Sequence, residues 1–263
     1  PGTERVLVHI FWTDDPPAAL WQPVPTWFHR LTAAGIAARA VLPDAFVGSG
    51  LTDAAYRGAI FRGVAPEADY PGELLDEVRA GPGLIYGYTN ALDAAAHACG
   101  VGSPQWHAAA EYVDAMLTRL VDGLPPDTML LVTADHGGLN VPAEARIDLD
   151  ADPALRAGVA VVAGEPRVRY LHTVPGAADD VRAAWSERLA GRADVFARDE
   201  AIGAGLFGAV RDEHRARIGD VVAIATGDTA ILASEHEPSI ITNMVGFHGA
   251  RSSAELAIPL ICV

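Results

Sequence analysis

The sequence predicts an α/β fold with a mainly parallel sheet, and three observations lead to that prediction. A helix, a glycine and a short strand follow one another over residues 26–42, which is half of a β-α-β unit. A strand, a long amphipathic helix and another strand then follow over residues 83–134. Their apolar runs have the length of buried strands, and a helical crossover between successive strands makes a parallel pair.

The first 80 residues contain clear helix and turn signals. Thr26 follows a proline and is expected to cap a helix that runs through Ala33 and ends at Gly35, since threonine favours the N-cap and glycine the C-terminal end. The other elements expected here are an extended segment over 5–12 closed by Asp14, a strand over 36–42 ended by Pro43, and a helix over 71–79.

The long helix is the best-marked element of the middle region. Ser103 is expected at its N-cap, Pro104 in its first turn and Gly123 beyond its end, which is the usual distribution of these residues. Strands are expected on either side, over 83–88 and 128–134. Because parallel strands end at one edge of a sheet, residues 93–97 and 135–136 are expected near each other.

Residues 140–236 are expected to form an inserted α+β subdomain within a core made of residues 1–139 and 237–263. The expected strands cover residues 159–163, 167–173, 221–225 and 229–233, with a helix over 177–189 and more helix after 199. Asp220 and Asp228 are interpreted as turn residues. A glycine-flanked loop around His248 and a last strand over 257–263 complete the core.

Composition excludes several classes of function. The net charge is −15 and all 19 basic residues are arginine, which argues against a nucleic-acid surface and excludes lysine chemistry within this sequence. The two cysteines make neither a disulfide framework nor a CxxC zinc site. No apolar run reaches the roughly 18 residues of a membrane span, so no membrane contact is expected and a cytoplasmic location is predicted.

Five side chains are candidate metal ligands: Asp93, His97, Asp135, His136 and His248. Asp93 and His97 have i, i+4 spacing and share one face of a helical turn. Asp135 and His136 are neighbours at a strand end that runs into two glycines, so they can diverge to two adjacent metals. Carboxylates and imidazoles without thiolates suit Zn²⁺, Mn²⁺ or Fe²⁺. A pair of ions about 4 Å apart is the arrangement that clamps the oxygens of a displacement at phosphorus.

Three segments resemble the alkaline phosphatase superfamily, and within it the type I phosphodiesterase/nucleotide pyrophosphatase branch. They are Asp93-x-x-x-His97-x-x-Gly100, Thr133-Ala134-Asp135-His136-Gly137 and Gly246-Phe247-His248-Gly249. The resemblance covers most of the chain. It implies a three-layer α/β/α sandwich with a mainly parallel sheet, and two zinc ions as cofactors. Asp93, His97 and His248 would hold one zinc, and Asp135 and His136 would belong to the other.

The sequence departs from this family in two ways. The family also uses an aspartate and a threonine or serine nucleophile that precede these segments, and no match to them is found. We therefore expect a further N-terminal segment of roughly 80–110 residues, with the nucleophile upstream of Pro1. Cys99-Gly100-Val101 stands where the family often has an aromatic residue followed by Gly-Pro, which puts nucleotide stacking in question.

The resemblance implies a hydrolase of phosphodiester or pyrophosphate bonds that acts through a covalent phospho-threonine or phospho-serine intermediate. The expected substrate is a small phosphoester, including a nucleotide. Phosphomonoesterase, phosphonate hydrolase and phosphomutase activities of the same superfamily remain alternatives. So do a non-catalytic metal-binding fragment and a plain α/β binding domain without metal.

Overall fold

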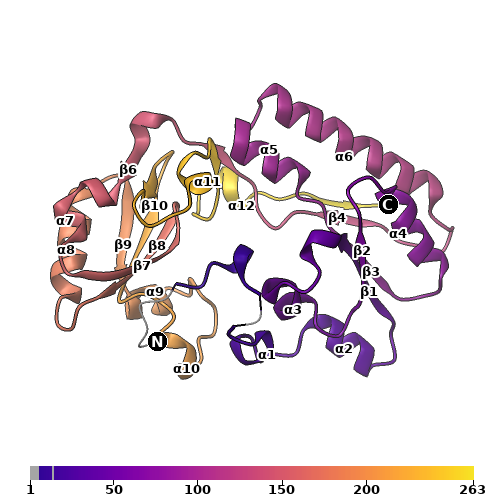
Figure 1. The fold of residues 1–263 in the computed structure, drawn as a ribbon, viewed down its shortest axis with the longest axis horizontal. Helices are drawn as coiled ribbons and strands as arrows, with labels where there is room; N and C mark the ends of the chain where they lie inside the picture. The colour runs from indigo at the N-terminus through magenta and orange to yellow at the C-terminus, as the bar shows by residue number, and fades with distance from the viewer. Residues whose placement is uncertain (1–5, 14) are drawn as a thin grey trace. The chain divides into compact units, whose positions relative to one another are not determined.

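The computed structural model describes residues 6–13 and 15–263 and has a mixed α/β fold (Figure 1). Its contacts divide the chain into two compact units. Unit 1 contains Asp93–His107 and Thr133–Leu260, and unit 2 contains Leu7–Leu92, Ala108–Val132 and Ile261–Val263. All five candidate ligands belong to unit 1. The division into a core and an inserted subdomain over 140–236 stays a prediction.

Unit 2 contains a three-stranded parallel sheet in the order β2-β1-β3. Helix α2 precedes it as predicted: the Thr26 side chain accepts a hydrogen bond from the His29 N–H, and Gly35 has φ of 78°. The elements of this part are α1 (Ala18–Trp21), α2 (Trp27–Ala33), β1 (Ala38–Pro43), η2 (Asp44–Phe46), α3 (Gly50–Tyr56), β2 (Ile60–Val64), α4 (Tyr70–Arg79) and β3 (Leu84–Gly87).

Helices α4 and α6 (Pro104–Gly123) build the core of unit 2 on this sheet. Leu74, Leu75 and Leu120 are buried against Val41 and Val64 of the strands. The Ser103 hydroxyl accepts a hydrogen bond from the Trp106 N–H, so the predicted start of the long helix is confirmed. Its apolar stripe covers the sheet as its spacing indicates.

The predicted parallel pairing of residues 83–88 with 128–134 is wrong. Strand β3 pairs with β1, and the shorter strand β4 (Leu131–Thr133) pairs with the last strand, β13 (Leu260–Cys262). The N–H and C=O groups of Leu130 and Val263 exchange hydrogen bonds of 2.9 and 3.0 Å. Succession along the chain suggests adjacency, but here a strand more than 120 residues away provides the partner.

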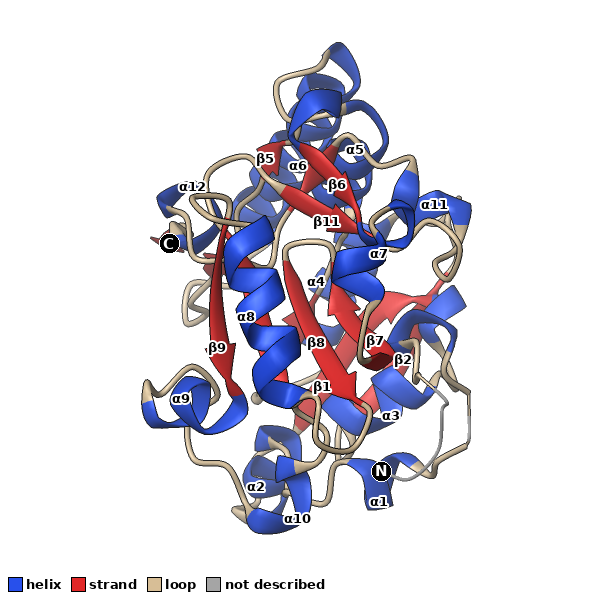
Figure 2. Ribbon diagram, turned by 90° about the vertical axis from the view of Figure 1, so that its left-hand side faces the viewer, coloured by secondary structure: helices blue, strands red, loops and turns tan. Residues whose placement is uncertain are grey.

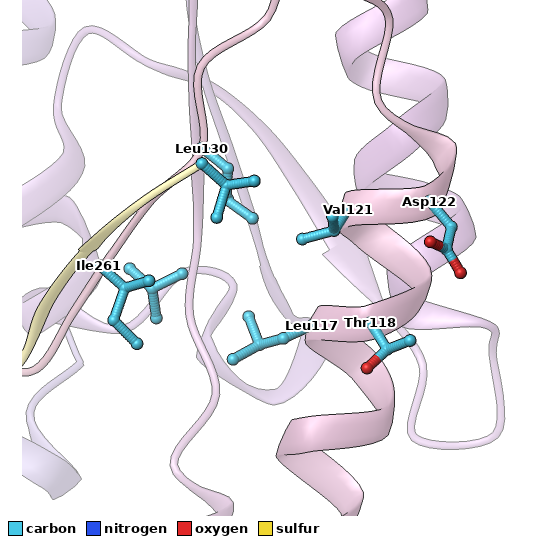
Figure 3. Close-up of a pocket in the computed structure, with 8 residues that line it drawn as sticks. Leu117, Thr118, Val121, Asp122, Leu130 and Ile261 are labelled. Atoms are coloured by element: carbon cyan, nitrogen blue, oxygen red, sulfur yellow. The ribbon is translucent and has the colours of Figure 1, made fainter.

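Strands β4 and β13 border an apolar recess in unit 2 (Figure 3). Leu117, Thr118 and Val121 of α6 line one side of it, and Leu130 and Ile261 line the other. Asp122 is its one acidic residue. This recess lacks the carboxylate and imidazole groups of the predicted chemistry, which lie in unit 1.

The predicted extended segment at the start of the chain is wrong where the structure describes it. Residues 6–8 are irregular and η1 (His9–Phe11) is a 3₁₀ turn. The next residue, Trp12, is 3 % exposed, donates from Nε1 to the Pro16 carbonyl and packs edge-on against Trp21. Burial of this large ring outweighs the strand preference of the apolar run. Arg5 of the predicted segment and Asp14, which was expected to close it, lie outside the described residues.

Unit 1 contains an antiparallel sheet in the order β7-β8-β10-β9. Helix α8 lies across one face of this sheet (Figure 2) and buries Val181 and Trp185 against Leu171 and Val221. The strands of this sheet and its helix are β7 (Val159–Glu165), β8 (Val168–Thr173), α8 (Ala178–Arg188), β9 (Ala193–Ala197) and β10 (Val221–Ala225). The predicted strands and helix are confirmed, whereas β9 was not predicted.

Two short ribbons complete the strands of unit 1. Strand β6 (Arg146–Asp148) pairs in parallel with β11 (Ala230–Leu232), and β5 (Leu139–Asn140) pairs antiparallel with β12 (Gly246–Phe247). The helices are α5 (Ala91–Cys99), η3 (Ala143–Ala145), η4 (Leu149–Ala151), α7 (Pro153–Arg156), α9 (Arg198–Gly203), α10 (Asp212–Arg215), α11 (Ser239–Thr242) and α12 (Ser253–Leu256). Among the residues described, no helix has the length and apolarity needed to cross a membrane.

An Arg–Glu ion pair is buried inside unit 1. Arg167, just before β8, and Glu255 of α12 have side chains that are 0 % and 1 % exposed. Burial by itself raises the pKa of Glu255. Hydrogen bonds from Arg167, Ser252 and the Ala250 N–H outweigh that effect and lower the pKa from 4.5 to about 2. The carboxylate is therefore ionised in the folded protein at neutral pH.

We expect Leu155→Ala to lower the free energy of unfolding of unit 1 by about 3–5 kcal/mol, because Leu155 is 1 % exposed and its removal leaves a cavity. The matched control is Leu256→Ala in the same unit. Leu256 is 63 % exposed, so its loss should cost less than about 0.5 kcal/mol. Urea unfolding measures both, and equal costs would contradict the described core.

We expect the destabilisation by Glu255→Gln to depend on pH. Because the folded pKa is depressed, the ionised carboxylate contributes its stability above pH 4.5 and loses it as the pH falls towards 2. The shift corresponds to about 3 kcal/mol at pH 7. Glu144→Gln, at an exposed glutamate, is the control. Urea unfolding from pH 7 to pH 2.5 measures the difference, and a pH-independent cost would disprove the prediction.

Candidate metal centre

Helix α5 carries the first two candidate ligands. Asp93 lies in its first turn and His97 in its last, and His97 Nε2 lies 3.2 Å from Asp93 Oδ1. The other ring nitrogen, Nδ1, lies 2.9 Å from the Gly246 carbonyl oxygen. A carbonyl only accepts, so Nδ1 carries the proton there. In the neutral ring this leaves the Nε2 lone pair directed towards Asp93 and available to a metal.

The third ligand of this group comes from the other end of the chain. His248 follows β12, and its Nε2 lies 3.7 Å from the same Asp93 Oδ1. One donor atom from each of Asp93, His97 and His248 lies within 4.8 Å of the others. A carboxylate and two imidazoles at this separation fit a zinc ion or a similar divalent metal. The structure thus brings together the three residues that the resemblance assigns to one metal.

Asp135 and His136 lie next to this group. The His136 and His248 rings stack with centroids 3.5 Å apart and an angle of 15°. His136 Nδ1 lies 2.8 Å from the Gly137 carbonyl oxygen, and its Nε2 lies 3.7 Å from Asp135 Oδ1. The Asp135 side chain is 70 % exposed. The five predicted residues are therefore neighbours, but Asp135 and His136 do not join the group of three ligands.

Backbone contacts bring the ligand-bearing segments together. The Val245 N–H donates to the His97 carbonyl over 2.8 Å, which fixes the start of β12 against the end of α5. Gly246 permits this approach, because a Cβ there would lie 2.5 Å from the Ala96 carbonyl oxygen. Strand β12 then pairs with β5, with Gly246 opposite Asn140. The segment after His136 is thereby linked to the segment before His248.

The Asn140 side chain links β5 to the chain that follows α5. Its Oδ1 accepts from the Val101 N–H over 2.7 Å, and its Nδ2 donates to the Val101 carbonyl over 2.9 Å. Val101 follows α5, so the end of β5 is positioned relative to the helix that carries Asp93. Sequence reasoning missed Asn140, because a lone asparagine after two glycines gives no signal beyond a turn.

The electrostatic environment differs between the histidines. The hydrogen bond with Asp93 raises the pKa of His97 above its usual 6.5, against the opposing effect of burial. Burial, followed by the charge of His136, lowers the pKa of His248 to about 4. Burial raises the pKa of Asp93, but the hydrogen bond with His97 and the charges of His97, His248 and His136 together lower it by more. His248 is accordingly neutral at pH 7 and presents a lone pair.

A second group of potential ligands occurs in the described part of unit 1: Asp150, Glu235 and His236. Asp150 is buried, and its Oδ1 lies 3.3 Å from Arg156 Nη1 and 3.1 Å from His236 Nδ1. The Glu235 N–H donates to its Oδ2 over 2.9 Å. These contacts describe a carboxylate that pairs with Arg156 and holds the loop of Glu235 and His236.

The remaining residues singled out by sequence have structural contacts. Asp220 lies in a bend just before β10 and Asp228 in the turn after it, so their interpretation as turn residues is confirmed. The Asp220 side chain accepts from the Thr173 N–H and pairs with Arg198. Both cysteines are free and exposed. The Thr89 hydroxyl accepts from the Ala91 N–H, and the Thr133 hydroxyl donates to the Pro259 carbonyl.

Solved structures of phosphoester and phosphonate hydrolases share the fold. Murine ectonucleotide pyrophosphatase / phosphodiesterase 5, solved as an inactive variant with AMP, is 18 % identical with a TM-score of 0.67, over 89 % of this chain and 62 % of that one. The human protein is 16 % identical with a TM-score of 0.67, over 93 % and 64 %. Phosphonoacetate hydrolase from Sinorhizobium meliloti, with phosphonoformate, is 18 % identical with a TM-score of 0.62, over 90 % and 68 %.

These comparisons confirm the predicted alkaline-phosphatase-type α/β fold. The chain spans less than two thirds of the length of the ectonucleotide pyrophosphatase / phosphodiesterase chains. No curated protein sequence matches it. The family model described as "Type I phosphodiesterase / nucleotide pyrophosphatase" matches residues 1–251. The chain therefore belongs to the type I phosphodiesterase / nucleotide pyrophosphatase family.

Proposed function

We propose that this protein hydrolyses small phosphodiesters or pyrophosphates with the help of two divalent metal ions. The observation that supports this most directly is the group of Asp93, His97 and His248, whose donor atoms lie within 4.8 Å of one another. His97 is oriented by its bond to the Gly246 carbonyl, and such outer contacts set the direction of a ligand ring. Family membership supports phosphoryl chemistry at this group.

The proposal assigns Asp93, His97 and His248 to one metal, and Asp135 and His136 to the other. Stacking of His136 on His248 places the two sets side by side, which favours neighbouring ions. When bound, such ions neutralise negative charge on the oxygens of the phosphoryl group and on the attacking oxygen. Zinc suits this mixture of imidazoles and carboxylates best, with manganese or iron as alternatives.

The chain's own residues prepare the site for this chemistry. His248 is neutral at pH 7 because burial lowers its pKa to about 4, so no proton opposes its use as a ligand. Asp93 lies within 4 Å of both His97 and His248 and balances positive charge gathered there. Asp135 is 70 % exposed, which leaves its carboxylate accessible from solvent.

The nucleophile is proposed to be a threonine or serine hydroxyl supplied by polypeptide outside these 263 residues. The hydroxyls of Thr89 and Thr133 support this, because they form hydrogen bonds with backbone groups of Ala91 and Pro259. The phosphoryl group would pass to that hydroxyl and then to water, which splits the hydrolysis into two displacements. The proposed substrate class is a small phosphoester, which is supported by the murine neighbour solved with the phosphate ester AMP; the hydrolase neighbour was solved with a phosphonate, phosphonoformate.

We expect His97→Asn to weaken zinc binding at least about 100-fold, because it removes one of three convergent donors. The control is His107→Asn, at an exposed histidine of helix α6. Competition with a chromophoric chelator measures the zinc dissociation constant. If both variants bind zinc as the unaltered protein does, the assignment of His97 is wrong.

We expect metal-free protein to lose hydrolysis of bis-p-nitrophenyl phosphate and to regain it with zinc or manganese. Asp135→Asn should reduce the restored rate about 100-fold to 1,000-fold, because it weakens the stabilisation of negative charge on the phosphoryl oxygens. The control Asp127→Asn, at an exposed loop, should leave the rate unchanged. Rates on the mono-ester p-nitrophenyl phosphate separate a diesterase from a monoesterase. Zinc binding without hydrolysis of either ester would support the alternative of a non-catalytic metal-binding fragment.

A further inference from the structure

Glu255 contacts both loops that carry the later candidate ligands. Its backbone carbonyl accepts from the Gly137 N–H over 2.8 Å, one residue after His136. Its side-chain Oε1 accepts from the Ala250 N–H over 2.9 Å, two residues after His248. A single residue therefore links two segments that are more than 100 positions apart in the sequence.

Arg167 holds the Glu255 side chain in place. Its Nε lies 2.9 Å from Oε1 and its Nη2 lies 2.7 Å from Oε2, which is the two-point geometry that fixes a carboxylate most firmly. Its remaining Nη1 donates to the Thr229 carbonyl. The Ser252 hydroxyl adds a hydrogen bond of 2.6 Å to Oε2. Arg167, just before β8, and Ser252, at the start of α12, therefore set the orientation of the Glu255 side chain.

Close packing accompanies these bonds. Gly137 faces the Ala254 carbonyl so closely that a Cβ there would lie 2.1 Å from its oxygen. A Cβ at Gly249 would lie 3.7 Å from Arg167 Cβ. The His136 loop therefore lies against α12, and the His248 loop lies against the Arg167 side chain.

The stability of such a pair does not by itself explain its presence. Removing two charges from water costs several kcal/mol per ion, and apolar residues of similar volume are often as stabilising. Geometric specificity is the feature that an apolar pair would not supply. At this place in the fold, the geometry that is specified is the spacing between the His136 and His248 segments.

We propose that Arg167 and Glu255 are positioning residues that hold the His136 and His248 loops at the spacing required for metal binding. The expected effect on metal affinity rests on the proposed function. The contacts that hold the two loops belong to the metal-free protein and can be tested without metal. It predicts that weakening the pair reduces metal affinity by more than the loss of stability explains.

The chain contains a matched control for this pair: Arg169, which lies in β8 two residues after Arg167. Arg169 is 1 % exposed and binds Glu237 at two points, over 2.6 and 2.8 Å. Its other bonds go to the Ile231 and Gly164 carbonyls, and Glu237 accepts from the Ala233 N–H. None of these partners belongs to a ligand loop. Both pairs join a buried arginine to a glutamate at two points, but they differ in what they touch.

The first measurement compares Glu255→Gln with Glu237→Gln in metal-free protein. Amide hydrogen exchange followed by NMR should show the Ala250 N–H exchanging at least about tenfold faster in Glu255→Gln and unchanged in Glu237→Gln. The Gly137 N–H is an internal reference, because its acceptor is the backbone carbonyl of residue 255 and is kept in the variant. Unchanged exchange at Ala250 would overturn the proposal, whether or not the protein binds metal.

The second measurement is the zinc dissociation constant of the same variants, with unfolding free energies measured alongside. Glu255→Gln should weaken zinc binding about 10-fold to 100-fold, the usual effect of losing an outer contact. Glu237→Gln should stay within about twofold of the unaltered protein. Equal weakening by both variants would attribute the effect to general destabilisation and overturn the proposal. If the unaltered protein binds no zinc, the proposed function fails, and the exchange result still decides the positioning role.

The milder substitutions Arg167→Lys and Arg169→Lys serve if the glutamine variants do not fold. Lysine keeps the charge but loses the two-point geometry. Faster exchange at Ala250 and weaker zinc binding are expected for Arg167→Lys alone. The same behaviour in both lysine variants would overturn the proposal.

Discussion

The close approach of β12 to the end of helix α5 is the constraint on which the candidate site depends. The Val245 N–H bonds to the His97 carbonyl, the Gly246 carbonyl bonds to the His97 ring, and Gly246 has no side chain to prevent either contact. This approach brings His248 to Asp93 although 154 positions separate them in the numbering. With any larger residue at Gly246 the helix and the strand would move apart.

The rest of unit 1 is arranged around that approach. Strand β5 pairs with β12 and brings the segment after Asp135 and His136 alongside, while Asn140 connects β5 back to the chain after α5. Glu255 then joins the same two loops from the other side, supported by Arg167. The candidate ligands sit on short segments, so their spacing is set by these few hydrogen bonds rather than by long regular elements.

The electrostatics follow from the same geometry. Three imidazoles crowd around one partly buried carboxylate, and the consequences differ with position. His97 bonds directly to Asp93 and has a raised pKa, whereas His248 is buried beside His136 and has a pKa lowered to about 4. Such opposite shifts within one small cluster are typical of functional sites, where burial and charge partners are combined. Here they leave His248 neutral at pH 7 beside the Asp93 carboxylate, and imidazole and carboxylate groups are donors that divalent metals use.

The sequence by itself determined the α/β class, most of the helices and strands, and the five candidate ligands, because these depend on local signals. Thr26, Ser103 and the glycines that end helices act within a few residues, and the DxxxH and DHG segments are contiguous. Only the tertiary structure decided that β4 pairs with β13 and that residues 9–11 form a 3₁₀ turn just before the buried Trp12. It also decided that Asn140, Arg167 and Glu255 connect the ligand segments. These pairings and contacts join residues that are distant in the sequence. The packing of the whole unit brings such residues together, and it leaves no periodic signal in the sequence.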